Sequence, residues 1–429
     1  MNTMLDIIRA LTPLNRVFCS RDYDRSIEYL QEILPFRVLE YGPEDEINGW
    51  KIPPRWEVTE ACITRDGKMV YDGLAHPLSV IVLSASVDKT VTREKLREHL
   101  FFDHRYDDAL PYHFRRQYRS WERDWGFCVP KRLYESLEPG KYHVTIRTDE
   151  APGKLKLLEY THPGKLPQTI VLMSHLDHPG MSNDGLAGCA VGVEVMQRLQ
   201  GRETKFSYAL FLHQEVIGSE YYLGWMATEQ RQQIMEGLFL EMLGSKTQLA
   251  LQNAPGTVTN IETALATVLN DRKLPHRRGE YGDVVVNGEY IWHGYGIPVA
   301  SLSRFPYPEY HTDRDNMSII SAEGLEESVE IVMAAIEELE NSPVMITRFT
   351  GNICTSNPKY ELYVDPGEPA FGTVPSDLEV QKLRALMEKI PSLHRPVSVR
   401  ALAGELGLEE TIVTEYLRRW EAKGLIELV

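Results

Sequence analysis

The stretch MSHLDHPGMSNDGLAG, from Met173 to Gly188, brings two histidines and several acids or amides close together. His175 closes an apolar run, where a side chain can point into a cleft. Asp177 follows two residues later and could hydrogen-bond the imidazole, which would fix the tautomer of a metal-binding histidine. Asp184 lies in an Asn-Asp-Gly turn that presents its carboxylate outward. Because zinc takes imidazole and carboxylate ligands, this stretch predicts a metal site.

Three more polar groups follow apolar runs further along the chain. Glu215 lies at the end of such a run in FLHQEVIGSE, a suitable place for a general base. Glu241 ends another run in GLFLEMLG. His311 lies in an aromatic-rich loop, PEYHTDRDN, with Asp315 four residues later. Any one of them alone could be structural, so the prediction rests on the elements that would bring them together.

The pattern from Lys154 to Arg348 alternates short apolar runs with helical segments. It predicts an α/β fold: an open, mostly parallel sheet flanked by helices. Ligands of such sheets bind at the carboxyl ends of the strands, and each polar cluster above falls at a predicted strand end. The predicted strands are TIVLMSH, FSYALFLH, GLFLEML and IPVASLS, and GCAVGVEVMQRLQ is a predicted helix.

The sequence pattern changes along the chain, which predicts several domains. Residues 1–48 begin with helical patterns and, with 146–350, are assigned to the discontinuous α/β domain. Residues 49–145 carry short alternating runs and turn signals, so an inserted β-rich domain is expected there. Its run YHFRRQYRSWERDWGF could form a rim or a lid. The Pro/Gly-rich segment 364–376 is a predicted linker, and 377–429 resembles a winged helix-turn-helix.

The charge and composition of the chain limit which partners and cellular compartments are expected. The net charge is −16, and residues 377–429 hold 8 Lys/Arg against 9 Asp/Glu. This charge balance argues against a nucleic-acid partner and favours a structural or dimerisation role of the tail. The five cysteines are scattered and odd in number, which fits a reducing cytoplasm. No apolar run approaches the length of a membrane span, and the first residues lack the pattern of a signal peptide.

The order of the polar groups resembles that of the zinc aminopeptidases with a co-catalytic metal site. The shared order is His-x-Asp, Asn-Asp-Gly, a Glu after a strand, an acid-Met-x-Gly strand end, and His-Thr-x-x-Asp. This resemblance implies that His175, Asp184 and Glu241 bind one zinc ion. It also implies that Asp184 and His311 bind a second ion and that Asp177 is the acid behind the ligands. With its insert and tail, the chain looks like an aminopeptidase-like family of bacteria and archaea.

The chain departs from that family at one point. The aminopeptidases carry two adjacent glutamates, a base followed by a ligand, whereas this chain reads Gln214-Glu215-Val216. If Glu215 is the base, the second ion has lost a ligand and a single-zinc site becomes plausible. If Glu215 is the ligand, the amide of Gln214 cannot take a proton, so the pair holds no general base and peptidase activity is not expected. We favour the base, because attack by water needs one while a metal can complete its shell with water.

The function expected from these observations is that of a cytoplasmic zinc-dependent hydrolase with one or two zinc ions. An aminopeptidase acting on a peptide or a small amide is favoured, with Asp283 or an acid of the insert holding the substrate's amino group. We expect His178 and His213 to support the site rather than bind metal, and Arg304 and Tyr310 could line the pocket. The alternatives are a deacylase on the same fold and a metal-binding regulator whose peptidase domain is inactive. A homodimer is a reasonable expectation.

Overall fold

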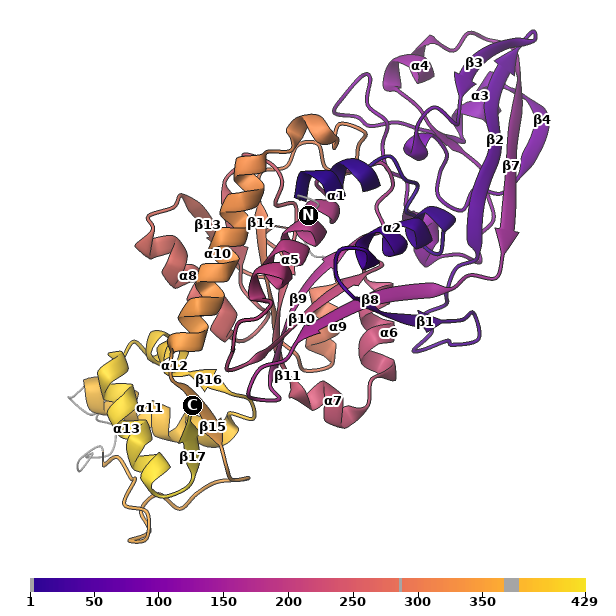
Figure 1. Ribbon diagram of the computed structural model, residues 1–429. Coiled ribbons are helices and arrows are strands. Elements are labelled where there is room, and N and C mark those ends of the chain that lie inside the picture. The colour runs from indigo at the N-terminus through magenta and orange to yellow at the C-terminus, as the bar shows by residue number, and fades with distance from the viewer. Residues whose placement is uncertain (1–3, 285–287, 366–377) are drawn as a thin grey trace, which may run out of the picture.

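A computed structural model describes residues 4–284, 288–365 and 378–429, and its centre is an eight-stranded sheet (Figure 1). The strand order is β1-β8-β10-β9-β11-β14-β12-β13, in which β10, β9, β11 and β14 run parallel to their neighbours in that group. The prediction of an open, mostly parallel α/β sheet is therefore confirmed. The strands are β1 (Arg37–Tyr41), β8 (Leu155–His162), β9 (Thr169–His175), β10 (Ser207–His213), β11 (Ile234–Leu240), β12 (Leu249–Gln252), β13 (His276–Gly279) and β14 (Val299–Arg304).

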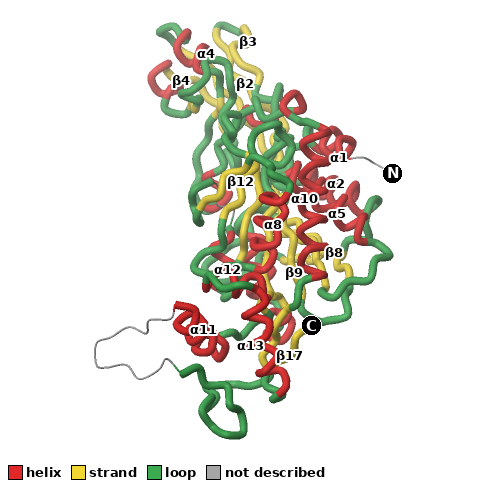
Figure 2. Tube along the Cα trace, turned by 90° about the vertical axis from the view of Figure 1, so that its left-hand side faces the viewer, coloured by secondary structure: helices red, strands yellow, loops and turns green. Residues whose placement is uncertain are grey.

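Helices cover both faces of this sheet, so its central strands are buried and mostly apolar. Alternate residues of β9 belong to different cores: Ile170 and Leu172 to one, Val171 and Met173 to the other. The first core contains side chains of α1 (Met4–Leu11), α2 (Arg21–Gln31), α5 (Leu186–Leu199), α8 (Asn260–Asp271) and α10 (Ala322–Asn341). The second contains side chains of α6 (Ile217–Trp225) and α9 (Glu289–Gly294), and α7 (Thr228–Gln233) leads into β11 (Figure 1). Figure 2 shows α1, α2, α5 and α10 of the first core lying together.

Helix α5 approaches the sheet closely because it begins with small residues. A Cβ at Gly188 would lie 1.9 Å from the carbonyl oxygen of Leu240, so no larger residue fits there. This contact brings the N-terminal end of α5 beside the end of β11. The sequence thereby places the turn before α5 next to the residues that follow β11.

The predicted β-rich insert forms a sheet of its own, of order β3-β2-β7-β4. Its core includes Trp56, Phe127 and Ile146, and the Asp66-Gly67 turn joins β2 to β3 as its sequence predicts. Strand β7 continues the insert to Ala151. The elements are β2 (Arg55–Arg65), β3 (Lys68–Asp72), β4 (Val87–Thr92), α3 (Arg93–Arg97), β5 (Leu100–Phe101), β6 (Phe127–Cys128), α4 (Lys131–Ser136), β7 (Lys141–Ala151) and the short 3₁₀ helices Pro77–Ser79 and Arg115–Tyr118.

The C-terminal part combines three helices with a small sheet around Trp420. Its strands are β15 (Val344–Thr347), β16 (Val397–Ser398) and β17 (Ile426–Leu428), and its helices are α11 (Leu378–Lys389), α12 (Val399–Leu406) and α13 (Glu410–Ala422). Strand β15 lies within the range 146–350 yet pairs with the tail strands. Most of the predicted linker 364–376 lies outside the described residues. The winged helix-turn-helix stays a prediction. Among the described residues, no helix is long and apolar enough to cross a bilayer.

Candidate metal centre

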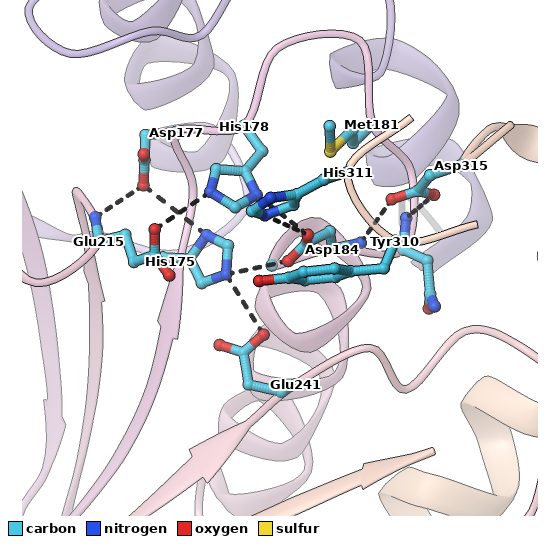
Figure 3. Close-up of polar contacts among 12 residues, drawn as sticks. His175, Asp177, His178, Met181, Asp184, Glu215, Glu241, Tyr310, His311 and Asp315 are labelled. Atoms are coloured by element: carbon cyan, nitrogen blue, oxygen red, sulfur yellow. Dashed lines mark hydrogen bonds and ion pairs between the residues drawn. The ribbon is translucent and has the colours of Figure 1, made fainter. Parts of the chain in front are cut away.

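Every predicted site residue lies at or just beyond the carboxyl end of a strand of the central sheet. His175 is the last residue of β9, Glu215 follows β10, and Glu241 follows β11. Asp184 precedes α5, and His311 lies in the loop after β14. Because β9, β10, β11 and β14 are neighbours and parallel, these ends meet, and the side chains converge (Figure 3).

Tight turns with positive φ angles orient these side chains toward the site. The residues after Asp184, Glu215 and Glu241 are Gly185, Val216 and Met242, with φ of 73°, 61° and 49°, and His311 itself has φ 55°. A non-glycine residue in this left-handed region is uncommon, and for β-branched Val216 it is strained, a feature that clusters at functional sites.

The turn after Asp184 needs glycine for a second reason. A Cβ at Gly185 would lie 2.3 Å from the carbonyl oxygen of His175. Gly185 therefore lets the two candidate ligands, His175 and Asp184, approach each other.

His175 and two carboxylates form the first group. Nε2 of His175 lies 3.3 Å from Oδ1 of Asp184 and 3.3 Å from Oε2 of Glu241. All three residues are buried. Behind the ring, Nδ1 of His175 lies 3.7 Å from Oδ1 of Asp177, which also accepts the backbone N–H of Glu215 at 2.7 Å. Asp177 therefore occupies the position of the acid behind the ligands that the sequence indicated.

Asp184 faces a second group with its other oxygen. Oδ2 of Asp184 lies 3.3 Å from Nδ1 of His178 and 3.4 Å from Nε2 of His311. Nε2 of His178 in turn lies 3.3 Å from Oε2 of Glu215. The structure thus brings all six predicted residues together and adds His178, whose ligand atom lies within 4.8 Å of those of His175 and Asp184.

The donor atoms of these groups fit a metal ion better than they fit one another. A tetrahedral zinc ion with bonds of about 2.0–2.1 Å separates its ligand atoms by about 3.3–3.4 Å, the separation seen here. The converging atoms are nevertheless buried and without a hydrogen-bond partner among the described residues. They are Nε2 of His175, Nδ1 of His178, Oδ2 of Asp184, both carboxylate oxygens of Glu241, and Nε2 of His311.

The charges of the site point to the same conclusion. Burial alone would raise the pKa of Asp184, but His178 and His175 hold it well below its usual range. Burial raises the pKa of Glu241 to about 7, although His175 opposes this. Burial would lower the pKa of His178, but Asp184 and the hydrogen bond to Glu215 together raise it to about 10. This pocket of carboxylates therefore needs positive charge, which a cation supplies.

Two residues without a predicted role hold the site loops. The carboxylate of Asp315 accepts the backbone N–H groups of Ser182, Asn183 and Asp184 at 3.1, 2.7 and 2.9 Å. The fully buried Arg16 donates to the carbonyls of Leu11, Leu176, His178 and Met181. Apart from the bond to Leu11, these hydrogen bonds join segments far apart in sequence, and a local pattern carries no signal for such contacts. Only the His-Thr-x-x-Asp motif could have drawn attention to Asp315.

The insert closes one side of the site. Pro111 pairs with Thr312, and Tyr112 N–H donates to the carbonyl of His311. The ring of Tyr112 contacts His178 and His311, Phe114 contacts His311, and Tyr310 stacks on His311 with centroids 3.8 Å apart. Of the candidate site residues, His311 and Glu215 have the most exposed side chains, 16% and 11%, whereas His178 and Asp184 are 2% exposed. A substrate must therefore reach the site past these two residues.

Other candidates from the sequence have different surroundings. Asp283 closes its own loop by accepting the N–H of Glu280. Arg304 pairs with Glu327 and donates to two carbonyls. His213 is buried and stacks on Phe211. Within the described part of the chain, no side-chain hydrogen bond or ion pair joins these three residues to the candidate metal ligands.

Comparison with solved structures identifies the fold. A candidate peptidase from Clostridium acetobutylicum matches with a TM-score of 0.74 at 22% identity, over 99% of this chain and 96% of that one. A zinc aminopeptidase from Bacillus subtilis matches with a TM-score of 0.59 at 13% identity, over 78% of this chain and 95% of that one. An aminopeptidase from Aneurinibacillus sp. strain AM-1 matches with a TM-score of 0.53 at 16% identity, over 78% and 93%. The protein therefore has an aminopeptidase-like fold.

Comparison of sequences gives a relative and a family. A Clostridium acetobutylicum protein is 26% identical over 348 residues, which are 79% of this chain and 77% of that protein. Its name refers to polysaccharide biosynthesis and to an "aminopeptidase-like domain". Residues 5–342, well over half of the chain, match the family described as "Domain of unknown function (DUF4910)", and the protein belongs to that family.

Proposed function

We propose that the protein is a zinc-dependent amide hydrolase and that its favoured reaction is the removal of N-terminal residues from peptides. One observation carries this proposal. Nε2 of His175, which is buried and has no hydrogen-bond partner among the described residues, lies 3.3 Å from Oδ1 of Asp184 and 3.3 Å from the equally unpartnered Oε2 of Glu241, and Glu215 lies nearby. Zinc bound there supplies Lewis-acid chemistry, since it acidifies water and polarises a carbonyl group.

Glu215 is the proton carrier in this proposal. Burial would raise the pKa of Glu215, but the hydrogen bond from His178 and the nearby histidines lower it to about 2. Its carboxylate therefore stays ionised and can accept a proton from the attacking water and return it to the leaving amine. Within the described residues, the contacts of this carboxylate with His178 and Tyr118 all go to Oε2. Oε1 is the oxygen that remains to take the proton.

A second candidate is a deacylase that acts on an amide of an amino sugar or an N-acyl amino acid. Two observations favour it. The relative's name refers to polysaccharide biosynthesis. The insert also presents aromatic rings, those of Tyr112, Phe114 and Tyr118, to the site, and among the described contacts no acid of the insert reaches it to hold a free amino terminus.

Hydrolysis of a mixed peptide library by the full-length protein, reloaded with zinc and read by mass spectrometry, tests the proposal. N-acetylated amino sugars and N-acetyl amino acids form a second arm, and chelated protein is the control. Stepwise loss of N-terminal residues that the chelator abolishes supports the aminopeptidase. Release of acetate alone supports the deacylase. No cleavage in either arm by fully metallated protein contradicts both and leaves the metal-binding regulator.

A further inference from the structure

We propose that His178 is a ligand of a second metal ion, together with Asp184 and His311, in place of the carboxylate that this chain lacks. The inference rests on the proposed function, because it concerns the same metal centre. It differs from the sequence-based expectation, which gave His178 a supporting role. With His178 as the ligand, Glu215 does not have to bind the metal and can act as the general base alone.

The missing carboxylate is the starting point. The resemblance expects two adjacent acids here, a base and a ligand, whereas this chain has only Glu215, so with Glu215 as the base no second acid is left to bind the ion. The side chain of Gln214 is buried with neither polar atom hydrogen-bonded within the described residues. Glu215 turns its Oε2 to His178 and Tyr118. In the described contacts, Oδ2 of Asp184 therefore meets two imidazole nitrogens, those of His178 and His311.

The geometry of the two rings fits one shared ion. Imidazoles that bind the same tetrahedral ion through bonds of about 2.0–2.1 Å place their ring centres about 5 Å apart. The centroids of His178 and His311 are 5.3 Å apart, with an interplanar angle of 78°. His175 and His178 are closer, at 4.3 Å, and face different oxygens of Asp184. Asp184 is therefore placed to bridge two ions rather than to share one with all three histidines.

The surroundings of His178 prepare its Nδ1 for a metal. Nε2 hydrogen-bonds Oε2 of Glu215, whereas Nδ1 has no hydrogen-bond partner among the described residues. A proton on Nε2 leaves the Nδ1 lone pair facing Oδ2 of Asp184, and a carboxylate behind a metal-bound histidine is the usual arrangement. Asp177 has the corresponding place behind His175.

The backbone of His178 is also fixed. Arg16 donates to its carbonyl oxygen at 2.6 Å. The ring is thus held between two carboxylates, Asp184 and Glu215, by a loop that a buried guanidinium anchors.

Metal content measured independently of activity tests this inference. Full-length wild type, His178→Ala and His213→Ala would be reloaded with zinc, desalted and analysed by elemental mass spectrometry. His213 is the matched control, because it is also a buried histidine and pairs with His175 in the sheet without facing a carboxylate ligand. We expect two ions in wild type and His213→Ala and one in His178→Ala, with the lost ion bound at least about 100-fold more weakly. Millimolar imidazole should restore it.

Cobalt spectra and a milder variant complete the test. Cobalt-loaded His178→Ala should lose the part of the visible absorption that the second equivalent adds to wild type. If His178→Ala does not fold, His178→Gln serves in its place. Two ions in the folded variant, or a single ion in both wild type and variant, would overturn the inference and leave the hydrolase proposal standing. A wild type that binds no zinc would overturn the metal centre itself.

Discussion

The hydroxyl of Tyr118 donates to Oε2 of Glu215 across 3.2 Å, although the two residues lie 97 positions apart in the sequence. Tyr118 ends the 3₁₀ helix Arg115–Tyr118 of the insert, and Glu215 follows a strand of the central sheet. The insert therefore does more than cover the site, because it contacts the carboxylate that is proposed to move the proton.

Tyr118→Phe should lower kcat and leave the zinc content unchanged. It removes a hydrogen bond to a charged group, worth about 1.5–3 kcal/mol, so a tenfold to hundredfold loss is expected if the bond is made in the transition state. Steady-state kinetics on the best substrate from the library would measure it. Tyr134→Phe, elsewhere in the insert, is the control. An unchanged kcat would show that Tyr118 does not act on Glu215.

Glu215→Gln should abolish most of the activity. The amide keeps the size of the side chain but cannot accept a proton, and loss of a general base costs about 10²–10⁴ in rate. Zinc content should stay at the wild-type value if Glu215 is not a ligand. Hydrolysis at the parent rate would show that Glu215 is not the base. A variant that lost one ion would make Glu215 a ligand, the alternative that the sequence left open.

Asp315→Asn should weaken metal binding without touching a ligand. Its carboxylate accepts three backbone N–H groups around Asp184, and an amide NH₂ would face donors instead. Loss of such an outer partner costs about 10–100-fold in metal affinity. Competition with a chelator would measure it, with Asp313→Asn as the control, because Asp313 binds the insert at Leu110 instead. If Asp315→Asn bound zinc as tightly as the wild type, Asp315 would not support the metal site.

The sequence predicts the sheet, and it predicts which candidate residues lie together, for one physical reason. Strands buried on both faces read as short apolar runs, and the predicted strand TIVLMSH coincides with β9 (Thr169–His175). Where parallel strands end, their last polar residues meet, so His175, Glu215 and Glu241 could be placed together before any coordinates.

The rest depends on contacts that local patterns do not encode. His178 follows the strand in a loop, where no periodicity decides which way a side chain points. Arg16 acts through bonds to carbonyls about 160 residues away. The run YHFRRQYRSWERDWGF could be recognised as a rim from its sequence. The contact between Tyr118 and Glu215, however, depends on how the insert packs against the central sheet. Strand β15 shows the same limit, since its partners β16 and β17 lie beyond the predicted linker.

His213 should make the metal-free protein sensitive to acid. Burial lowers the pKa of His213 to about 3, although the carbonyl of Gln214 opposes this, and the nearby charged groups are His175 and Glu215. The ordinary pKa of histidine is 6.5. Between pH 6.5 and about 3, His213 is therefore protonated in the unfolded chain but neutral in the folded chain, so the free energy of unfolding falls as the pH falls. From pH 6.5 to 4 this should cost about 3 kcal/mol.

His213→Phe tests that expectation, since phenylalanine keeps a ring against Phe211 and cannot be protonated. Thermal unfolding of both chelated proteins would be followed from pH 7.5 to 4. The melting temperature of wild type should fall more steeply below pH 6.5 than that of the variant, and the two curves should run parallel above it. Parallel curves over the whole range would mean that His213 accepts its proton in the folded protein. The acid sensitivity would then belong to the carboxylates of the metal centre, which must be ionised to hold the histidines in place.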